Sequence, residues 1–287
     1  MRWLVRAVVA ALISLAGALS VAAAAQRWWP ACKRGDFDAV ACIKAQDHLY
    51  DYVAPTAPWV PVGDAALLAG VAMTLLAIGV TLLPWLWLPR RPLVSLAVAV
   101  PALAVLLVGG LTWSAGLSHE IPAVEIVPAI LVWSFGLPLV LAAAAATSRD
   151  DHTAQWTTRW RVVISVLIAM ATPLGEVMFA PILLGYLSHD STPWTGAVTG
   201  ALLVTAGCAV WPSTSGPRRP TAARTSAGRG RRGPFGEAWE VPTTAPPGHR
   251  KRGPSLLDRD LDWTVVAPIR RQLAGWALVR ACGRAAR

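Results

Sequence analysis

The chain has 287 residues, of which 55% are hydrophobic and 15% are charged, and its formal net charge is +10 at pH 7. Soluble domains are about one quarter charged, so this composition argues against a soluble enzyme. Residues 1–211 carry 11 basic and 11 acidic side chains, whereas residues 212–287 carry 15 basic and 5 acidic ones. The excess positive charge therefore belongs to the C-terminal tail and does not by itself indicate a nucleic-acid-binding domain.

Long apolar runs dominate the first 211 residues. A helix of about 20 mostly apolar residues crosses a bilayer, because only intrahelical hydrogen bonds satisfy the backbone in lipid. Five runs have about this length, at residues 65–88, 93–113, 123–146, 162–184 and 194–211. The sequence therefore predicts an all-α, multi-pass membrane domain over residues 64–211.

A sixth apolar run, residues 1–25, has two interpretations. It is either a retained first helix, which gives six transmembrane helices, or a cleaved signal peptide, which leaves five. Its length favours a retained helix, because the apolar part of a signal peptide usually has only about 7–15 residues. In both cases residues 26–63 are predicted to form an extracytoplasmic loop.

Basic residues on the short loops predict the orientation. Arg90 and Arg91 occupy one loop, and residues 149–161 contain three further arginines. The alternate loops, residues 114–122 and 188–193, contain no Lys or Arg. Because basic loops stay on the cytoplasmic side, we expect both termini in the cytoplasm and the chain in the plasma (cytoplasmic) membrane.

The predicted extracytoplasmic loop contains two of the four cysteines, Cys32 and Cys42. Disulfides persist in an oxidising compartment, so a Cys32–Cys42 bridge is favoured over free thiols or soft metal ligands. Phe37, Val40 and Ile43 recur at helical spacing and predict a short helix within residues 36–52.

Trp28-Trp29-Pro30, the segment 47–52 and Pro58-Trp59 accompany an Ala-rich composition in which Arg is preferred over Lys. In these features the chain resembles uncharacterised integral membrane proteins of GC-rich actinobacteria. The resemblance covers about residues 28–70 and implies no activity.

Two acidic residues fall inside predicted helices. Glu176 lies near the middle of the run at 162–184, shortly after Pro173, and Glu125 lies near the outer end of the run at 123–146. A carboxylate in hydrocarbon costs several kcal/mol unless it is protonated, paired or hydrated, so such residues are functional candidates by default. They either bind a proton or cation on a transport path, or form a hydrogen bond between helices without further function.

The two short extracytoplasmic loops repeat one pattern, Leu-Ser-His followed by an acidic residue, at 117–120 and 187–190. Together with a histidine of the long loop, these side chains are ligands that Zn²⁺ or Cu²⁺ accepts. The alternative is that serine and acidic residues end helices and that the histidines are harmless interfacial residues. The candidate metal ligands are His48, His119, His189, Glu120 and Asp190.

The C-terminal tail has two parts. Residues 212–255 are rich in Pro, Gly, Ser, Thr and Arg, and we expect them to be disordered. Residues 256–287 are predicted to form a short cytoplasmic helical segment. Anionic lipids of the inner leaflet are favoured as the partner of the basic side chains over an acidic protein, and nucleic acid is disfavoured. The side chains expected to make this contact are Arg218, Arg219, Arg229, Arg231, Arg232, Arg250, Lys251 and Arg252.

Motifs of common enzyme classes are missing from the sequence. It contains no Walker A loop, Gly-x-Ser-x-Gly, His-Glu-x-x-His or Cys-x-x-Cys motif, and it predicts no cofactor. This favours a non-enzymatic scaffold or accessory subunit that contacts another membrane protein. The alternatives are a transporter or channel component that uses Glu176, and a membrane enzyme with a metal site on its outer face.

Overall fold

The computed structural model describes residues 2–32, 36–88, 92–146, 154–186, 188 and 190–214. The chain divides into two compact units, Met1–Pro217 and Arg218–Arg287, and the described residues belong to the first. The disordered tail was predicted at residues 212–255, but residues 212–214 are the last residues of a helix that ends at Thr214. The rest of that tail, the predicted helical segment at 256–287 and all eight basic residues expected to contact lipid lie outside the described residues.

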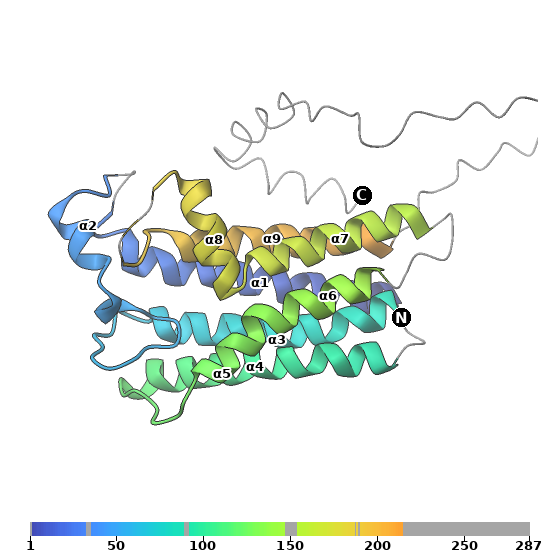
Figure 1. The fold of residues 1–287 in the computed structure, drawn as a ribbon, viewed down its shortest axis with the longest axis horizontal. Coiled ribbons are helices and arrows are strands. Elements are labelled where there is room, and N and C mark those ends of the chain that lie inside the picture. Colours follow the sequence, from blue (N-terminus) through green and yellow to red (C-terminus); the bar gives the residue numbers. More distant parts are fainter. Residues whose placement is uncertain are drawn as a thin grey trace, which may run out of the picture. The chain divides into compact units, whose positions relative to one another are not determined.

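Helices make up most of the described residues, and no strand occurs among them, which confirms the predicted all-α class (Figure 1). The helices in chain order are α1 (Arg2–Trp28), α2 (Val40–Ala45), the 3₁₀ turn η2 (His48–Tyr50), α3 (Ala65–Trp87), α4 (Pro92–Ser118), α5 (Val127–Leu131), the π-helical segment η3 (Val132–Gly136), α6 (Leu137–Ala146), α7 (Ala154–Met170), α8 (Pro173–Leu184) and α9 (Thr195–Thr214).

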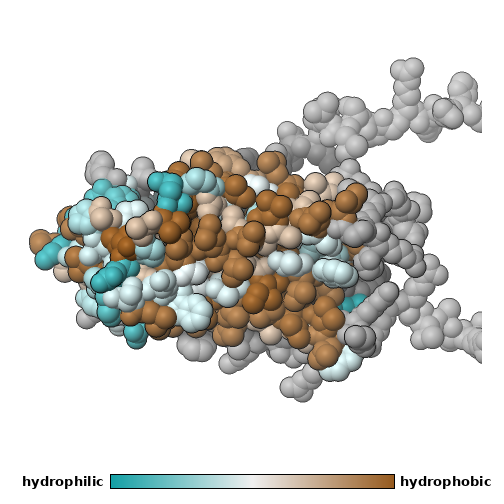
Figure 2. Space-filling view, turned by 90° about the horizontal axis from the view of Figure 1, so that it is seen from below, coloured by the Kyte–Doolittle hydropathy of each residue, from teal (hydrophilic) through white to brown (hydrophobic). Residues whose placement is uncertain are grey.

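Five segments of the described chain are long and apolar enough to cross a membrane as single helices. They are Trp3–Trp28, Ala65–Trp87, Leu93–Ser118, Val127–Ala146 and Thr195–Ser213. In Figure 2, apolar side chains cover the side of the bundle and hydrophilic side chains gather at one end. Large apolar side chains on α4, such as Leu93, Leu96 and Leu103, are exposed, as lipid contact requires. These features are those of a helical membrane protein.

The run at 162–184 is two helices instead of the single helix that the sequence predicted. α7 ends at Met170, and α8 starts at Pro173 with its axis turned by 90°. Pro173 cannot continue the hydrogen-bond ladder of α7, because it lacks an N–H. The Thr172 hydroxyl caps α8 by accepting a hydrogen bond from the Gly175 N–H at 3.3 Å. The pair forms either one broken span or a re-entrant segment.

Other helix ends differ from the predicted ones by a few residues. α1 continues to Trp28, and α4 continues to Ser118 instead of ending near residue 113. The span predicted at 123–146 begins at Val127, with Pro128 in the first turn of α5. The predicted surface helix is short, because α2 covers only Val40–Ala45 before the turn η2.

The helices pack closely where glycines face neighbouring backbones. Gly17 of α1 and Gly200 of α9 are so close that a Cβ on either would collide with the other's carbonyl oxygen. Gly70 of α3 lies in the same way against Trp113 of α4. Such contacts let helix backbones approach closely. In lipid this close packing stabilises helix association, because no hydrophobic effect drives the helices together.

The loops that follow α1, α4 and α8 lie at the same end of the bundle (Figure 1). We call this the disulfide end, and it comprises the described parts of residues 29–64, 119–126 and 185–194. Cys32 and Cys42 form a disulfide there with their Cα atoms 4.7 Å apart, as the sequence predicted.

Candidate functional site

The break between α7 and α8 places Glu176 in the first turn of α8. Gly175 makes the sharp turn possible, because a Cβ at this residue would collide with the carbonyl oxygens of Ala169 and Met170 at the end of α7. The Glu176 N–H donates to the Thr172 carbonyl at 2.7 Å, which fixes the start of the helix. The local sequence therefore holds an acidic side chain at a bend within the apolar bundle.

Threonine hydroxyls of α9 are the polar neighbours of the Glu176 carboxylate. Thr199 donates a hydrogen bond to Oε2 at 3.3 Å, and Thr195 lies one turn before it on the same face of the helix. In the part of the chain that the structure describes, Glu176 takes part in no ion pair. Its charge is thus left without a basic partner among these residues.

Glu176 lines a cavity of about 380 Å³ whose lining extends to the disulfide end. Arg27, Asp51 and Asp190 line the cavity near that end. Met73 and Leu76 also line it, and they lie 8 and 11 residues into α3, which is a depth of about 12–17 Å along the helix axis. The cavity therefore connects the polar loops with the apolar interior of the bundle.

Trp133 reaches the same cavity from the π-helical segment η3. Its side chain is buried, and its indole N–H has no hydrogen-bond partner in the described structure. Short π-helical segments interrupt the regular hydrogen-bond ladder and are frequent at functional sites. Two irregular helices, η3 and the α7–α8 pair, thus contribute to one cavity.

Tyr52 joins the disulfide end to this cavity. Its side chain is buried, and its hydroxyl lies against Gly196 in the first turn of α9. Burial raises the pKa of the Tyr52 phenol well above its usual value of about 10, and the nearby Glu176 carboxylate raises this pKa further. The phenol is therefore a neutral group between the loops and Glu176.

Arg27, at the end of α1, holds the long loop in place. Its Nη1 donates to Asp51 Oδ1 at 2.6 Å, its Nη2 to the Asp47 carbonyl at 3.0 Å and its Nε to the Ala45 carbonyl at 3.1 Å. The guanidinium also lies over the ring of Trp28, 4.3 Å from its centroid. Each of the three guanidinium nitrogens therefore has a hydrogen-bond acceptor.

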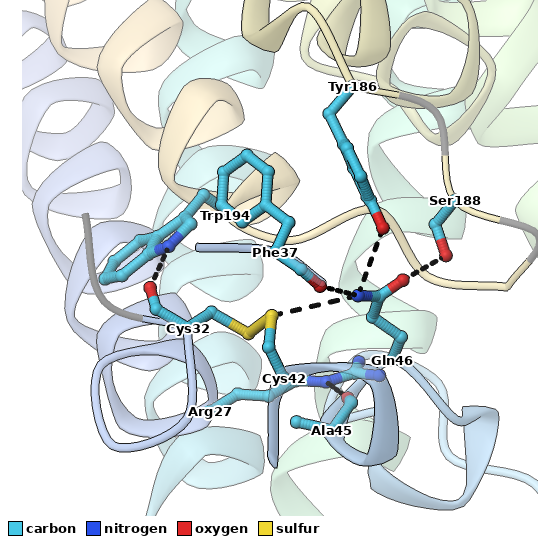
Figure 3. Close-up of a disulfide and its surroundings, with 9 residues drawn as sticks. All are labelled: Arg27, Cys32, Phe37, Cys42, Ala45, Gln46, Tyr186, Ser188 and Trp194. Atoms are coloured by element: carbon cyan, nitrogen blue, oxygen red, sulfur yellow. Dashed lines mark hydrogen bonds between the residues drawn. A yellow bond between two sulfur atoms is a disulfide. The ribbon is translucent and has the colours of Figure 1, made fainter. Parts of the chain in front are cut away.

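Gln46 fastens the disulfide-bonded loop to the segment between α8 and α9 (Figure 3). Its amide nitrogen donates to the Phe37 carbonyl at 3.1 Å and lies 3.5 Å from the Tyr186 hydroxyl. Its amide oxygen accepts a hydrogen bond from the Ser188 hydroxyl. Trp194 also connects these two segments, because its indole N–H donates a hydrogen bond to the Cys32 carbonyl at 3.1 Å. These hydrogen bonds therefore connect the disulfide-bonded loop with the segment that leads into α9, which includes the cavity-lining residue Ser188.

The two acidic residues that the sequence singled out lie in different environments. Glu176 lies in the cavity, whereas Glu125 precedes α5 and is exposed instead of lying inside a helix. The Glu125 carboxylate accepts a hydrogen bond from the Val127 N–H at 3.2 Å.

The candidate metal ligands are spread over the disulfide end. His48 is paired with Asp51 at 2.8 Å, and Glu120 and Asp190 are exposed. His119 ends α4 with a left-handed φ of 56°, and His189 lies outside the described residues. No group of three or more His, Cys, Asp or Glu side chains suited to a metal occurs among the described residues.

The repeated Leu-Ser-His-acid pattern marks two similar turns. Ser118 Oγ accepts a hydrogen bond from the Glu120 N–H at 3.2 Å, and Ser188 Oγ accepts one from the Asp190 N–H at 3.1 Å. A serine that bonds to the backbone two residues later terminates regular structure. The pattern thus has a structural explanation at both loops.

The sequence interpretation missed several residues of the site. Thr195 and Thr199 form a polar pair one helical turn apart, and this spacing indicates a polar stripe on one face of the last helix. Arg27, Gln46 and Tyr52 gave no comparable signal, because their partners lie far away in the sequence.

No protein-family model, no curated protein and no solved structure matches this chain. The described helices are those of a membrane protein, and they enclose a cavity lined by the Glu176 carboxylate.

Proposed function

We propose that this protein is a transporter or channel component in which Glu176 binds a proton or a cation during its passage across the membrane. One observation carries the proposal. The Glu176 carboxylate lines a cavity of about 380 Å³ directly after a helix break, its described hydrogen-bond partners are threonine hydroxyls, and no described basic side chain forms an ion pair with it. Intramembrane carboxylates in such positions mark ion and proton pathways.

The broken helix supports the same function. Discontinuous helices form the substrate and ion sites of many transporters, because they bring polar backbone and side chains into the bilayer. Here the 90° bend between α7 and α8 directly precedes the carboxylate.

The cavity gives this function better support than the scaffold role that the sequence favoured. A scaffold needs contact surfaces but no carboxylate within a cavity of its membrane domain. In our proposal the disulfide end is the extracytoplasmic end, because basic loops stay cytoplasmic. The site then lies toward the outside, and Asp190, an exposed acidic residue of the lining, attracts cations to it.

The test compares Glu176→Gln with Glu125→Gln in liposomes that contain the purified full-length chain. Glutamine keeps the shape of Glu176 and removes only its charge, whereas Glu125 is an exposed acid outside the cavity. Proton, Na⁺ and K⁺ fluxes are measured under an imposed membrane potential, with an internal pH dye or ion dye.

We expect the wild type to conduct one of these ions. The flux of this ion should be at least tenfold lower for Glu176→Gln and unchanged for Glu125→Gln. The proposal is wrong if the wild-type flux does not exceed that of empty liposomes, or if Glu176→Gln leaves it unchanged. Elution profiles and unfolding temperatures show whether both variants are folded.

A further inference from the structure

The charged groups that line the cavity are mostly acidic. Asp51, Glu176 and Asp190 contribute three carboxylates, and Arg27 contributes one guanidinium. His48 also lines the cavity, where its Nδ1 pairs with Asp51. With all three carboxyl groups counted as ionised and the histidine as neutral, the formal charge of this lining is −2. A cavity that is lined by one sign of charge concentrates ligands of the opposite sign.

Arg27 does not neutralise Glu176. Its three nitrogens are engaged by Asp51 and by the carbonyls of Asp47 and Ala45, and its ion pair is with Asp51 at 2.6 Å. The carboxylate of Glu176 faces threonine hydroxyls instead. Arg27 lines the same cavity but forms no ion pair with Glu176, so the Glu176 carboxylate is available as an acceptor for a ligand cation.

Beyond Glu176 the lining becomes apolar. Met73 and Leu76 of α3, Trp133 of η3 and Leu203 of α9 all line the cavity, and all four side chains are buried. Trp and Met are polarisable, and Trp is the aromatic side chain that attracts cations most strongly. This part of the cavity suits a hydrocarbon or aryl group better than a hydrated inorganic ion.

The donor set beside Glu176 is too small for a dehydrated divalent metal ion. Zn²⁺ needs three or four nitrogen, sulfur or oxygen ligands, and Ca²⁺ needs six to eight oxygens. One carboxylate with the hydroxyls of Thr195 and Thr199 fits a single ammonium group, which requires only a few acceptors. The cavity size of about 380 Å³ is in the range of small-molecule sites.

We infer that the cavity binds a monovalent organic ammonium ion. Its nitrogen lies beside the Glu176 carboxylate, and its apolar part packs against Met73, Leu76 and Trp133. This inference rests on the proposed role of Glu176 as the cation-binding group, and it specifies which cations the site prefers.

The experiment measures binding to the full-length protein in nanodiscs, by ligand-detected NMR and by the shift in unfolding temperature. The probes are benzylammonium, its neutral analogue benzyl alcohol and its anionic analogue benzoate. Ethyl-, butyl- and hexylammonium form a second series. Empty nanodiscs report how much of each probe partitions into lipid, and Glu125→Gln is the matched control for Glu176→Gln.

Benzylammonium is expected to bind the wild type and Glu125→Gln equally, and to lose at least tenfold in affinity for Glu176→Gln. Benzyl alcohol and benzoate should bind at least tenfold more weakly than benzylammonium. Affinity in the alkyl series should rise by about fourfold for each added methylene after the lipid background is subtracted. Equal binding of benzyl alcohol, no dependence on Glu176, or no dependence on chain length would each overturn the inference.

The ion fluxes described above are measured without any organic ion, so the two proposals fail separately. If Glu176→Gln abolishes flux but no ammonium ion binds, only the ligand inference is wrong. If ammonium ions bind in a Glu176-dependent manner and neither inorganic-ion flux nor Glu176-dependent benzylammonium flux occurs in liposomes, the transport function is wrong and the ligand class is correct.

Discussion

The hydroxyl of Tyr52 occupies the space that a Cβ atom at Gly196 would need. Tyr52 comes from the loop that follows α1, and Gly196 lies in the first turn of α9, so this contact joins segments that are distant in the sequence. Both residues line the cavity that contains Glu176. A side chain at residue 196 therefore requires the buried tyrosine to move.

Gly196→Ala is expected to destabilise the protein by about 1–3 kcal/mol, because overpacking forces a buried neighbour out of position. Gly110→Ala is the matched control, since Gly110 is also helical but has open space around its Cβ position. Alanine favours a helix over glycine by up to about 1 kcal/mol, so the control should be unchanged or more stable. Thermal unfolding in detergent measures the stability of both variants. If Gly196→Ala and Gly110→Ala change the unfolding temperature equally, the close contact between Tyr52 and Gly196 is wrong.

Tyr52 should make the protein sensitive to alkaline pH. Burial raises the pKa of this phenol in the folded state, so above about pH 10 the unfolded chain loses the proton first. Stability is fully present below pH 10 and then falls by about 1.4 kcal/mol per pH unit for this group as the pH approaches the folded-state pKa.

Unfolding temperatures measured from pH 8 to pH 11.5 check this expectation. Tyr52→Phe should remove the extra alkaline loss, whereas Tyr50→Phe, which changes a partly exposed tyrosine of the same loop, should retain it. Parallel curves for the wild type and Tyr52→Phe would show that the phenol does not carry the effect.

Arg27→Ala should destabilise the disulfide end by about 2–3 kcal/mol. The Arg27 side chain is only 4% exposed, and its removal leaves two backbone carbonyls without this donor and leaves Asp51 with only His48 and Ser191 as described polar partners. The expected loss is below that of a fully buried pair, because Asp51 is 32% exposed and water partly screens its charge.

Lys44→Ala provides the control for Arg27→Ala, since Lys44 is an exposed basic residue of the same loop. Its replacement should change the free energy of unfolding by less than about 0.5 kcal/mol. If the two variants unfold at the same temperature, the Arg27 contacts do not contribute to stability.

Cysteine labelling tests the predicted orientation. A membrane-impermeant maleimide added to intact cells should label Asp190→Cys and should label Arg90→Cys only after the membrane is opened. The physical reason is the positive charge of the loop at residues 90 and 91, which favours the cytoplasmic side. The reverse labelling pattern would invert the proposed access to the cavity.

The sequence predicted most of the helices because lipid imposes a simple length and composition on each crossing segment. It also predicted the disulfide, since two nearby cysteines in an oxidising loop have few alternatives. The bend at Pro173 was harder to predict, because proline in a membrane helix causes outcomes from a mild kink to a complete break. The capping hydrogen bond of Thr172 favours the break here.

The candidate site was only partly predictable. An acidic residue inside an apolar run is visible in the sequence, so Glu176 could be singled out, whereas the late start of α5 leaves Glu125 outside the helix. The contacts of Arg27, Gln46 and Tyr52 join loops whose separation in sequence hides their pairing. The metal ligand set and the lipid contacts of the basic tail stay predictions.

The hydrogen bond between Gln46 and Ser188 spans 142 positions of the chain. At translation rates of about 5–20 residues per second, the ribosome needs roughly 7–30 s between the synthesis of these two residues. The loop that contains the disulfide thus exists for that time without its partner segment. The entrance of the cavity can be completed only when the last helices have been inserted, which makes this site a late product of membrane biogenesis.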